Sequence, residues 1–299
     1  MGGGKRRPTE NISRHLEGTT YRPKDPGEYS RWVKAAVERY DGDGKDDMPG
    51  LKIPAKHWQV DNEPPHGREG YADLVRITSK AIKEVDPESK VLIGGLTMPC
   101  GIGSRRYEKD ALPILRELNG KYIDILDLHW FGRTGEWKLL QEALSQVRKD
   151  LRSCNFKDIP IWITEMGTYS GKPAPRPRSQ FSRQSERQQA AEMVKRHIVA
   201  LGEGVEKVFW AWGMMEGFVD TEDNDFFDNT GLVYDGIGVE DPGKGVKKIS
   251  YWTYQEMTHL LGHWDSSPPE KIEAGEGVVA YRFRFSKNGK TGIVAVWVE

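Results

Sequence analysis

The chain has 299 residues, long enough to bury a sizeable hydrophobic core. Its 44 Lys and Arg residues nearly balance its 45 Asp and Glu residues, so its net charge of -1 gives no electrostatic reason to expect binding to nucleic acid or to an anionic membrane. Two cysteines are too few for a disulfide framework or a Cys-rich metal site. No apolar run is close to the length of about 18 residues that a membrane-spanning helix needs.

The beginning of the chain predicts little regular structure. Residues 1–24 are polar and lack a clear period, so we interpret them as a tail or linker. No apolar stretch follows the basic residues near Met1, so no signal peptide is visible and the compartment stays open. A helix with one apolar face is expected from Asp25 to about Tyr40, and Asp41-Gly-Asp-Gly ends it.

Strands and helices then alternate along the chain. Each expected helix has apolar residues at spacings of three and four, and each expected strand is a short apolar run. The expected strands cover 55–60, 90–97, 122–129, 159–164 and 205–212. The expected helices cover 71–85, 109–118, 136–152, 186–201 and 251–261. This alternation is typical of βαβ units with a parallel sheet.

The C-terminal end has a different pattern. Residues 277–285 alternate apolar and polar side chains, residues 291–297 form a second apolar run, and Asn288-Gly289 between them is a strong signal for a tight hairpin turn. We therefore expect an α/β domain over residues 25–265 and a β segment over residues 266–299 that begins a small β-domain.

Candidate chemistry follows the expected strands, because parallel α/β folds place their sites at the carboxyl ends of strands. Glu63 follows the first strand and Glu165 ends the fourth. Either glutamate alone is better explained as a capping or salt-bridging residue. Together, with His129 and tryptophans at the other strand ends, they favour a site. Two carboxylates across a sheet edge suit glycosidic bond cleavage.

Several motifs resemble those of clan A glycoside hydrolases, and of family 39-like members in particular. Trp58-Gln-Val-Asp-Asn-Glu-Pro resembles the segment at the end of the fourth barrel strand, and Ile161-Trp-Ile-Thr-Glu-Met-Gly resembles the segment of the seventh. Asp127-Leu-His-Trp and Phe209-Trp-Ala-Trp are similar to the sixth and eighth strands. The resemblance implies a (β/α)8 TIM-barrel type of fold that is incomplete, with strands four to eight present and the first three βα units absent.

The resemblance also implies roles for single residues. Glu63 would be the acid/base, Asn62 would hold the sugar 2-hydroxyl, and Glu165 would be the nucleophile. His129 would line the site. Trp130, Trp210 and Trp212 would contact the substrate. For Trp210 and Trp212, packing in the core is an equally good explanation.

That clan often has a tyrosine near its nucleophile. In this sequence Tyr169 or Trp130 could replace that tyrosine, or the position could have no equivalent. The strand-two arginine or histidine of the family has no counterpart in this sequence. Because three units are missing, the chain alone is expected to be poorly active.

The sequence therefore predicts a retaining glycoside hydrolase that needs no metal or other cofactor and acts on a carbohydrate substrate. The first alternative is a carbohydrate-binding or inactive relative of such enzymes. A second alternative is a different barrel hydrolase in which Glu63 and His129 bind a metal. The sugar, the linkage and the oligomeric state stay open.

Overall fold

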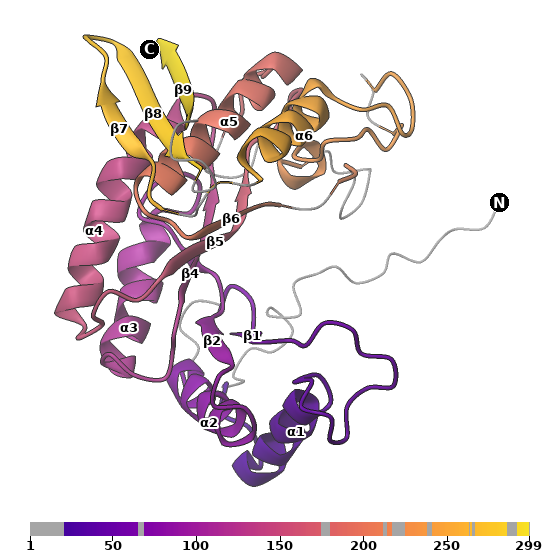
Figure 1. The fold of residues 1–299 in the computed structure, drawn as a ribbon, viewed down its shortest axis with the longest axis vertical. Helices are drawn as coiled ribbons and strands as arrows, with labels where there is room; N and C mark the ends of the chain where they lie inside the picture. The colour runs from indigo at the N-terminus through magenta and orange to yellow at the C-terminus, as the bar shows by residue number, and fades with distance from the viewer. Residues whose placement is uncertain are drawn as a thin grey trace. The chain divides into compact units, whose positions relative to one another are not determined.

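A computed structural model describes residues 21–64, 69–174, 180–211, 214–216, 225–237, 241–262, 264, 267–285 and 292–298. The chain forms two compact units, each described here by itself. The first unit contains Met1–Thr97, Arg105–Asp127 and Lys149–Ile159, and the second contains Met98–Ser104, Leu128–Arg148 and Pro160–Glu299. Figure 1 shows the succession of strands and helices along the chain. The predicted boundary between residues 265 and 266 stays a prediction.

The first unit contains the first strand–helix pairs. Its elements are α1 (Pro26–Glu38), β1 (His57–Val60), α2 (Tyr71–Val85), β2 (Lys90–Ile93), β3 (Leu96–Thr97), the π-helical turn η1 (Tyr107–Ala111) and α3 (Leu112–Leu118). Strands β1 and β2 pair in parallel, with Trp58 opposite Val91. Leu92 forms a further parallel bridge to Ile125. The predicted parallel arrangement is therefore confirmed for these strands.

A double glycine interrupts the strand predicted over residues 90–97. A Cβ on Gly94 would lie 2.5 Å from the Val60 carbonyl oxygen, so only glycine lets the ends of β1 and β2 approach this closely. Gly95 has a φ of 44°, which takes the backbone out of the strand conformation. The predicted strand is consequently divided into β2 and β3.

The second unit contains most of the remaining strand–helix pairs. Its elements are β4 (Leu126–Phe131, which begins in the first unit), η2 (Glu136–Leu139), α4 (Leu140–Ser153, which ends in the first unit), β5 (Ile161–Gly167), α5 (Glu186–Gly202), β6 (Lys207–Trp210), η3 (Phe227–Asn229) and α6 (Ile249–Leu261). Strand β5 lies between β4 and β6 and pairs with β6 in parallel. A capping box at Ser185 and Gln188 begins α5 where the sequence predicts it.

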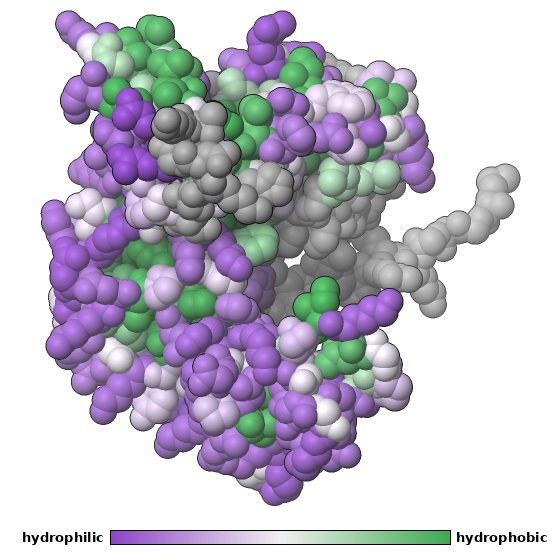
Figure 2. All heavy atoms as spheres, in the orientation of Figure 1, coloured by the Kyte–Doolittle hydropathy of each residue, from purple (hydrophilic) through white to green (hydrophobic). Residues whose placement is uncertain are grey.

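An antiparallel sheet ends the described chain. Its strands are β7 (Glu270–Glu273), β8 (Val278–Arg284) and β9 (Gly292–Val298), in that order. The predicted pairing of β8 with β9 is confirmed, whereas the predicted turn at Asn288-Gly289 lies outside the described residues. Figure 2 shows apolar residues gathered over this sheet. Three side chains of β9 are exposed: Val294, Val296 and Val298.

Helix α5 packs closely on this sheet. A Cβ on Gly202, the last residue of α5, would lie 2.3 Å from the ring of Tyr281, so the glycine makes room for that ring. Trp297 of β9 stacks with Tyr281 and meets Trp137 edge to face. Among the described residues, no helix combines the length and apolarity that crossing a membrane requires.

Candidate active site

The predicted nucleophile and its neighbouring histidine lie together in the second unit. His129 of β4 is 3% exposed, and its Nδ1 is 3.1 Å from Oε2 of Glu165 on the adjacent strand β5. Glu165 Oε2 is buried, and no donor among the described residues is aligned with it, so its contact with His129 is close but is not a well-directed hydrogen bond. The Glu165 side chain keeps 15% of its surface exposed, which leaves the carboxyl group reachable from solvent.

The other nitrogen of the same imidazole contacts the residue before Glu165. His129 Nε2 is 3.2 Å from the hydroxyl oxygen of Thr164. Neighbouring residues of a regular strand point to opposite faces of the sheet, so Thr164 and Glu165 would not ordinarily reach one ring. The pairing of β5 with β6 shifts between Ile163 and Met166, and this bulge re-aims the two side chains. Thr164 was not among the predicted site residues.

Glu63 lies at the end of β1 in the first unit. It adopts a φ of 43°, and Asp61 adopts a φ of 64°, so two residues without glycine's freedom occupy the left-handed region in one short turn. Such strain persists only where the surroundings impose it, and it is commonest at functional sites. The predicted approach of Glu63 to Glu165 stays a prediction.

Tyr71 holds the strand ends on which this turn is built. Its hydroxyl donates to the Val60 carbonyl (2.7 Å) and accepts from the Gly94 N–H (2.8 Å). Burial raises the pKa of Tyr71 far above its ordinary value, so the hydroxyl keeps the proton that it donates. Sequence periodicity identifies Tyr71 only as a core residue, because its role depends on the hydroxyl.

Asn62 lies in the same turn and is exposed. Its backbone N–H donates to the Asp61 carboxylate (2.8 Å), and its side-chain oxygen accepts from Gln59 (3.3 Å). The amide group is therefore positioned at the surface, and its predicted contact with a sugar hydroxyl stays a prediction.

The structure contradicts the predicted role of Trp130 in substrate contact. Its side chain is fully buried, and the Arg196 guanidinium of α5 lies 4.3 Å above its ring. Because alternate residues of β4 point to opposite faces, the strand that directs His129 one way directs Trp130 the other way. Trp130 is a core residue beneath α5.

Trp210 is likewise a core residue, and the structure contradicts its predicted role as a sugar platform. It is 9% exposed, its ring stacks with His197 of α5, and its Nε1 donates to the Thr230 carbonyl (3.0 Å). Trp212, the third predicted platform, lies outside the described residues.

Tyr169 was considered as a replacement for the tyrosine that clan A glycoside hydrolases often have near the nucleophile, but its side chain lies in the core. Its side chain is fully buried and its hydroxyl donates to the Ser182 carbonyl (2.7 Å). The ring belongs to an aromatic cluster with Phe181 and Phe226, to which Phe131 and Ala211 also contribute. Of the two candidates named from the sequence, Trp130 and Tyr169, neither is placed for that role.

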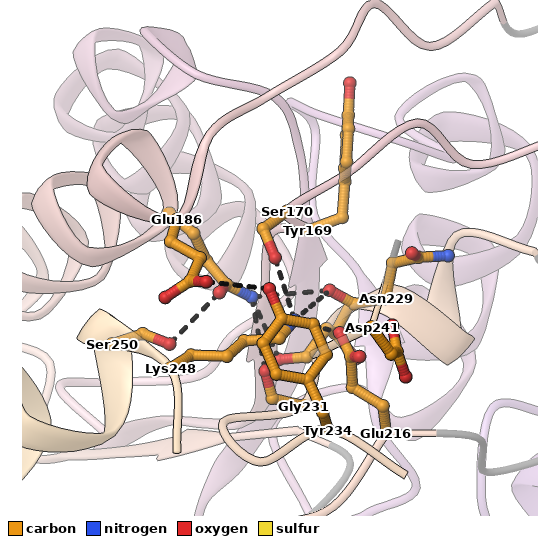
Figure 3. A network of polar contacts seen from close by, with 12 residues as sticks. Tyr169, Ser170, Glu186, Glu216, Asn229, Gly231, Tyr234, Asp241, Lys248 and Ser250 are labelled. Atoms are coloured by element: carbon orange, nitrogen blue, oxygen red, sulfur yellow. Dashed lines mark hydrogen bonds and ion pairs between the residues drawn. The ribbon is translucent and has the colours of Figure 1, made fainter. Parts of the chain in front are cut away.

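A buried lysine joins the segments that follow β5 and β6, and sequence reasoning missed it. Lys248 Nζ donates to the Ser170 hydroxyl (2.8 Å) and forms an ion pair with Glu216. Figure 3 shows this network, in which the Tyr234 ring lies beside the lysine and the Tyr234 hydroxyl donates to Glu186. The network fixes the segment that leaves β5 five residues after Glu165.

Comparisons with known proteins identify the fold. No family model and no curated protein matches the chain. Among solved structures, a glucosidase from Croceicoccus marinus is similar with a TM-score of 0.60 and 17% identity, over 89% of this chain and 55% of that chain. A family 39 glycoside hydrolase from Bacteroides cellulosilyticus WH2 gives a TM-score of 0.58 and 18% identity, over 91% and 50%.

A third similar structure belongs to another glycosidase family. The GH51 arabinofuranosidase from Xanthomonas axonopodis pv. citri has a TM-score of 0.56 and 14% identity, over 92% of this chain and 58% of that chain. The chain thus spans only about half the length of these solved structures. Over the part that can be compared, the chain has the fold of clan A-like glycoside hydrolases.

Proposed function

We propose that this chain hydrolyses O-glycosidic bonds with retention of configuration, using Glu165 as nucleophile and Glu63 as acid/base. The observation that carries the proposal is the bulge on β5, which places the Glu165 carboxyl 3.1 Å from the buried His129 on a glycosidase-like fold. A carboxylate packed against a buried imidazole at a strand end is confined on one side and keeps part of its surface exposed for attack.

In the first step, a Glu165 oxygen attacks the anomeric carbon while the bond from that carbon to the leaving oxygen breaks. Glu63 donates its proton to the leaving oxygen. The resulting glycosyl ester has no charge on Glu165, and Glu63 is now a carboxylate. In the second step Glu63 takes a proton from water, the water oxygen attacks the anomeric carbon, and the ester bond breaks to release Glu165.

His129 has a positioning role in this scheme. Its two ring nitrogens lie close to Thr164 and Glu165, so the buried imidazole limits where the Glu165 carboxyl can lie. The alternative of a carbohydrate-binding or inactive relative relies on an aromatic cleft, and the burial of Trp130 and Trp210 removes two of its three expected platforms.

The proposal predicts different effects for the two glutamates. Glu165→Ala is expected to reduce hydrolysis of every aryl glycoside to background, because the covalent step is lost. Glu63→Ala is expected to retain activity on dinitrophenyl glycosides, whose leaving group needs no proton, and to lose about 10²–10⁴-fold on glycosides with poor leaving groups. Release of the aglycone from a panel of sugars provides the measurement.

Glu142→Ala, which removes an exposed glutamate of α4, serves as the matched control and should leave all rates unchanged. Equal losses for Glu63→Ala on both classes of leaving group would contradict the acid/base assignment. Full activity of Glu165→Ala would contradict the nucleophile assignment.

A further inference from the structure

The buried hydroxyl of Tyr71 lies where strands β1 and β2 end. It donates to the Val60 carbonyl (2.7 Å) and accepts from the Gly94 N–H (2.8 Å), and the side chain is 2% exposed. Val60 and Ile93 are the last residues that the two strands pair in register, and Gly94 follows Ile93 directly. The hydroxyl therefore bridges the strands just beyond their last pair and closes the ladder there.

The strained turn that contains Glu63 begins at this bridge. Asp61 has a φ of 64° and Glu63 a φ of 43°, and backbone in this region persists only where the surroundings impose it. The Asp61 carbonyl packs on the backbone of Gly94, since a Cβ on that glycine would lie 2.7 Å from the carbonyl oxygen. Because the Gly94 N–H is bound to Tyr71, the hydroxyl fixes the backbone on which the turn rests.

Gln59 braces the same turn from its exposed side. Its Nε2 donates to the Asp61 carbonyl (3.1 Å) and to the side-chain oxygen of Asn62 (3.3 Å). The Asn62 N–H in turn donates to the Asp61 carboxylate (2.8 Å). One buried hydroxyl and one exposed amide thus hold the backbone that leads to Glu63.

The charges around Tyr71 keep its hydroxyl protonated. Burial raises the pKa of Tyr71 far above its ordinary value, and the nearby carboxylates of Asp61 and Asp127 raise it further. Asp127 is itself buried and accepts from the Gly95 N–H (3.2 Å). The bond from Tyr71 to the Val60 carbonyl therefore does not titrate in the pH range in which a glutamate acts as an acid.

We propose that Tyr71 and Gln59 are positioning residues for Glu63, and that by bracing the turn after β1 they set where Glu63 presents its proton to the leaving oxygen. The inference rests on the proposed acid/base role of Glu63. A general acid is effective only within hydrogen-bond reach of the atom that it protonates, and a misplacement of about 1 Å can cost about 10²-fold in rate. Loosening the turn should therefore slow the substrates that need the proton and spare those that do not.

Tyr71→Phe tests this role, because it removes the hydroxyl and keeps the ring that packs edge to face on Tyr21 (5.2 Å). The measurement is kcat/KM, which reports the first step, for glycosides whose leaving groups differ in acidity. We expect a loss of about 10-fold on poor leaving groups and of less than about 2-fold on dinitrophenyl glycosides. Gln59→Ala should steepen the leaving-group dependence in the same direction by a smaller factor.

Tyr107→Phe is the matched control. Tyr107 lies in the same unit, is also 2% exposed, and donates its hydroxyl to the Asp150 carboxylate (3.0 Å), so the variant loses a comparable hydrogen bond without touching the turn. It should change kcat/KM by the same factor for every leaving group. Amide hydrogen exchange gives a readout that needs no turnover: Tyr71→Phe should speed exchange at residues 61–63 by about 10-fold or more relative to α2, and Tyr107→Phe should not.

A folded Tyr71→Phe that keeps the wild-type leaving-group dependence overturns the inference, and so does Tyr107→Phe if it steepens that dependence as much. Should Tyr71→Phe fail to fold, Gln59→Ala decides in the same way. Should no glycoside be turned over, unchanged exchange at residues 61–63 overturns the inference. If Glu63→Ala slows all leaving groups equally, the acid/base assignment itself fails. A steep dependence in Glu63→Ala alone leaves that assignment standing and rejects only the positioning role.

Discussion

At the scale of single residues, the two buried tryptophans show how side-chain direction decides between a site and a core. Trp130 and Trp210 both face α5, where Arg196 covers the first ring and His197 stacks on the second. The sequence places aromatic residues at strand ends but does not identify the face of the strand toward the helices. His129, one residue before Trp130, points the other way and reaches Glu165.

His197 is expected to make the stability of the folded protein depend on pH in the acid range. The ring is buried, its Nδ1 donates to the Met193 carbonyl (2.7 Å), and its Nε2 has no hydrogen-bond partner among the described residues. Burial lowers the pKa of His197 to about 4, from an ordinary value of 6.5. Between pH 6.5 and pH 4, His197 is therefore protonated in the unfolded chain but not in the folded protein. Stability that is fully present above pH 6.5 is lost as the pH falls toward 4.

His197→Phe keeps an aromatic ring against Trp210 and removes the titration. We expect its free energy of unfolding to fall less steeply than that of the wild type between pH 6.5 and 4, by an amount on the order of a few kcal/mol at the acid end. Urea unfolding at several pH values measures the difference. Parallel curves for the two proteins would show that His197 does not determine the acid sensitivity.

At the scale of secondary-structure elements, Lys248 connects the segments after β5 and β6 through a buried ion pair. Lys248 is fully buried, Glu216 is 8% exposed, and the same ammonium group donates to Ser170. Removing one partner of a buried pair leaves a charge without compensation, which typically costs about 3–5 kcal/mol. Lys248→Met is therefore expected to lower the free energy of unfolding by about that amount.

Adding Glu216→Gln to Lys248→Met removes the uncompensated charge and should restore part of the loss, so the two substitutions are not additive. Lys247→Met, at the neighbouring exposed position, is the control and should change stability by less than about 1 kcal/mol. Chemical denaturation of Lys248→Met, Glu216→Gln, the double variant and Lys247→Met decides the question. Strict additivity in the double variant would mean that the ion pair contributes no coupling.

Element positions follow from the sequence wherever one local signal dominates. Helix α2 begins and ends at the predicted residues, because its apolar stripe is complete and a glycine precedes it. The strand predicted over 90–97 breaks at a close backbone approach between Gly94 and Val60, which no local pattern reveals. Strand β7 was missed because Glu-Lys-Ile-Glu has one apolar residue, and its pairing with β8 supplies the missing information.

In the candidate site, too, the sequence predicts the features that depend on local patterns and misses those that depend on contacts between distant residues. Placing Glu165 and His129 at neighbouring strand ends needs only the alternation of strands and helices, and their contact confirms that placement. The bulge that turns Thr164 and Glu165 toward one imidazole depends on the register with β6. The Lys248 network depends on a residue 78 positions from Ser170, which no single-sequence pattern connects.

At the scale of the whole molecule, a chain of strand–helix units ends in a three-stranded antiparallel sheet. Its likeness to glycosidases extends over about nine-tenths of its own length and half of theirs. Both proposed carboxylates are supplied by this chain, Glu63 by a strained turn after β1 and Glu165 by the bulge of β5. In the proposed mechanism, Glu165 forms a covalent bond to the sugar.

Mass spectrometry of the chain after incubation with dinitrophenyl 2-deoxy-2-fluoroglycosides can detect this bond, because the fluorine slows release of the glycosyl ester and allows it to accumulate. We expect one glycosyl group per chain, located by peptide mapping on Glu165 and absent from Glu165→Ala. Turnover of the corresponding aryl glycoside without any adduct, or an adduct on Glu63, would contradict it.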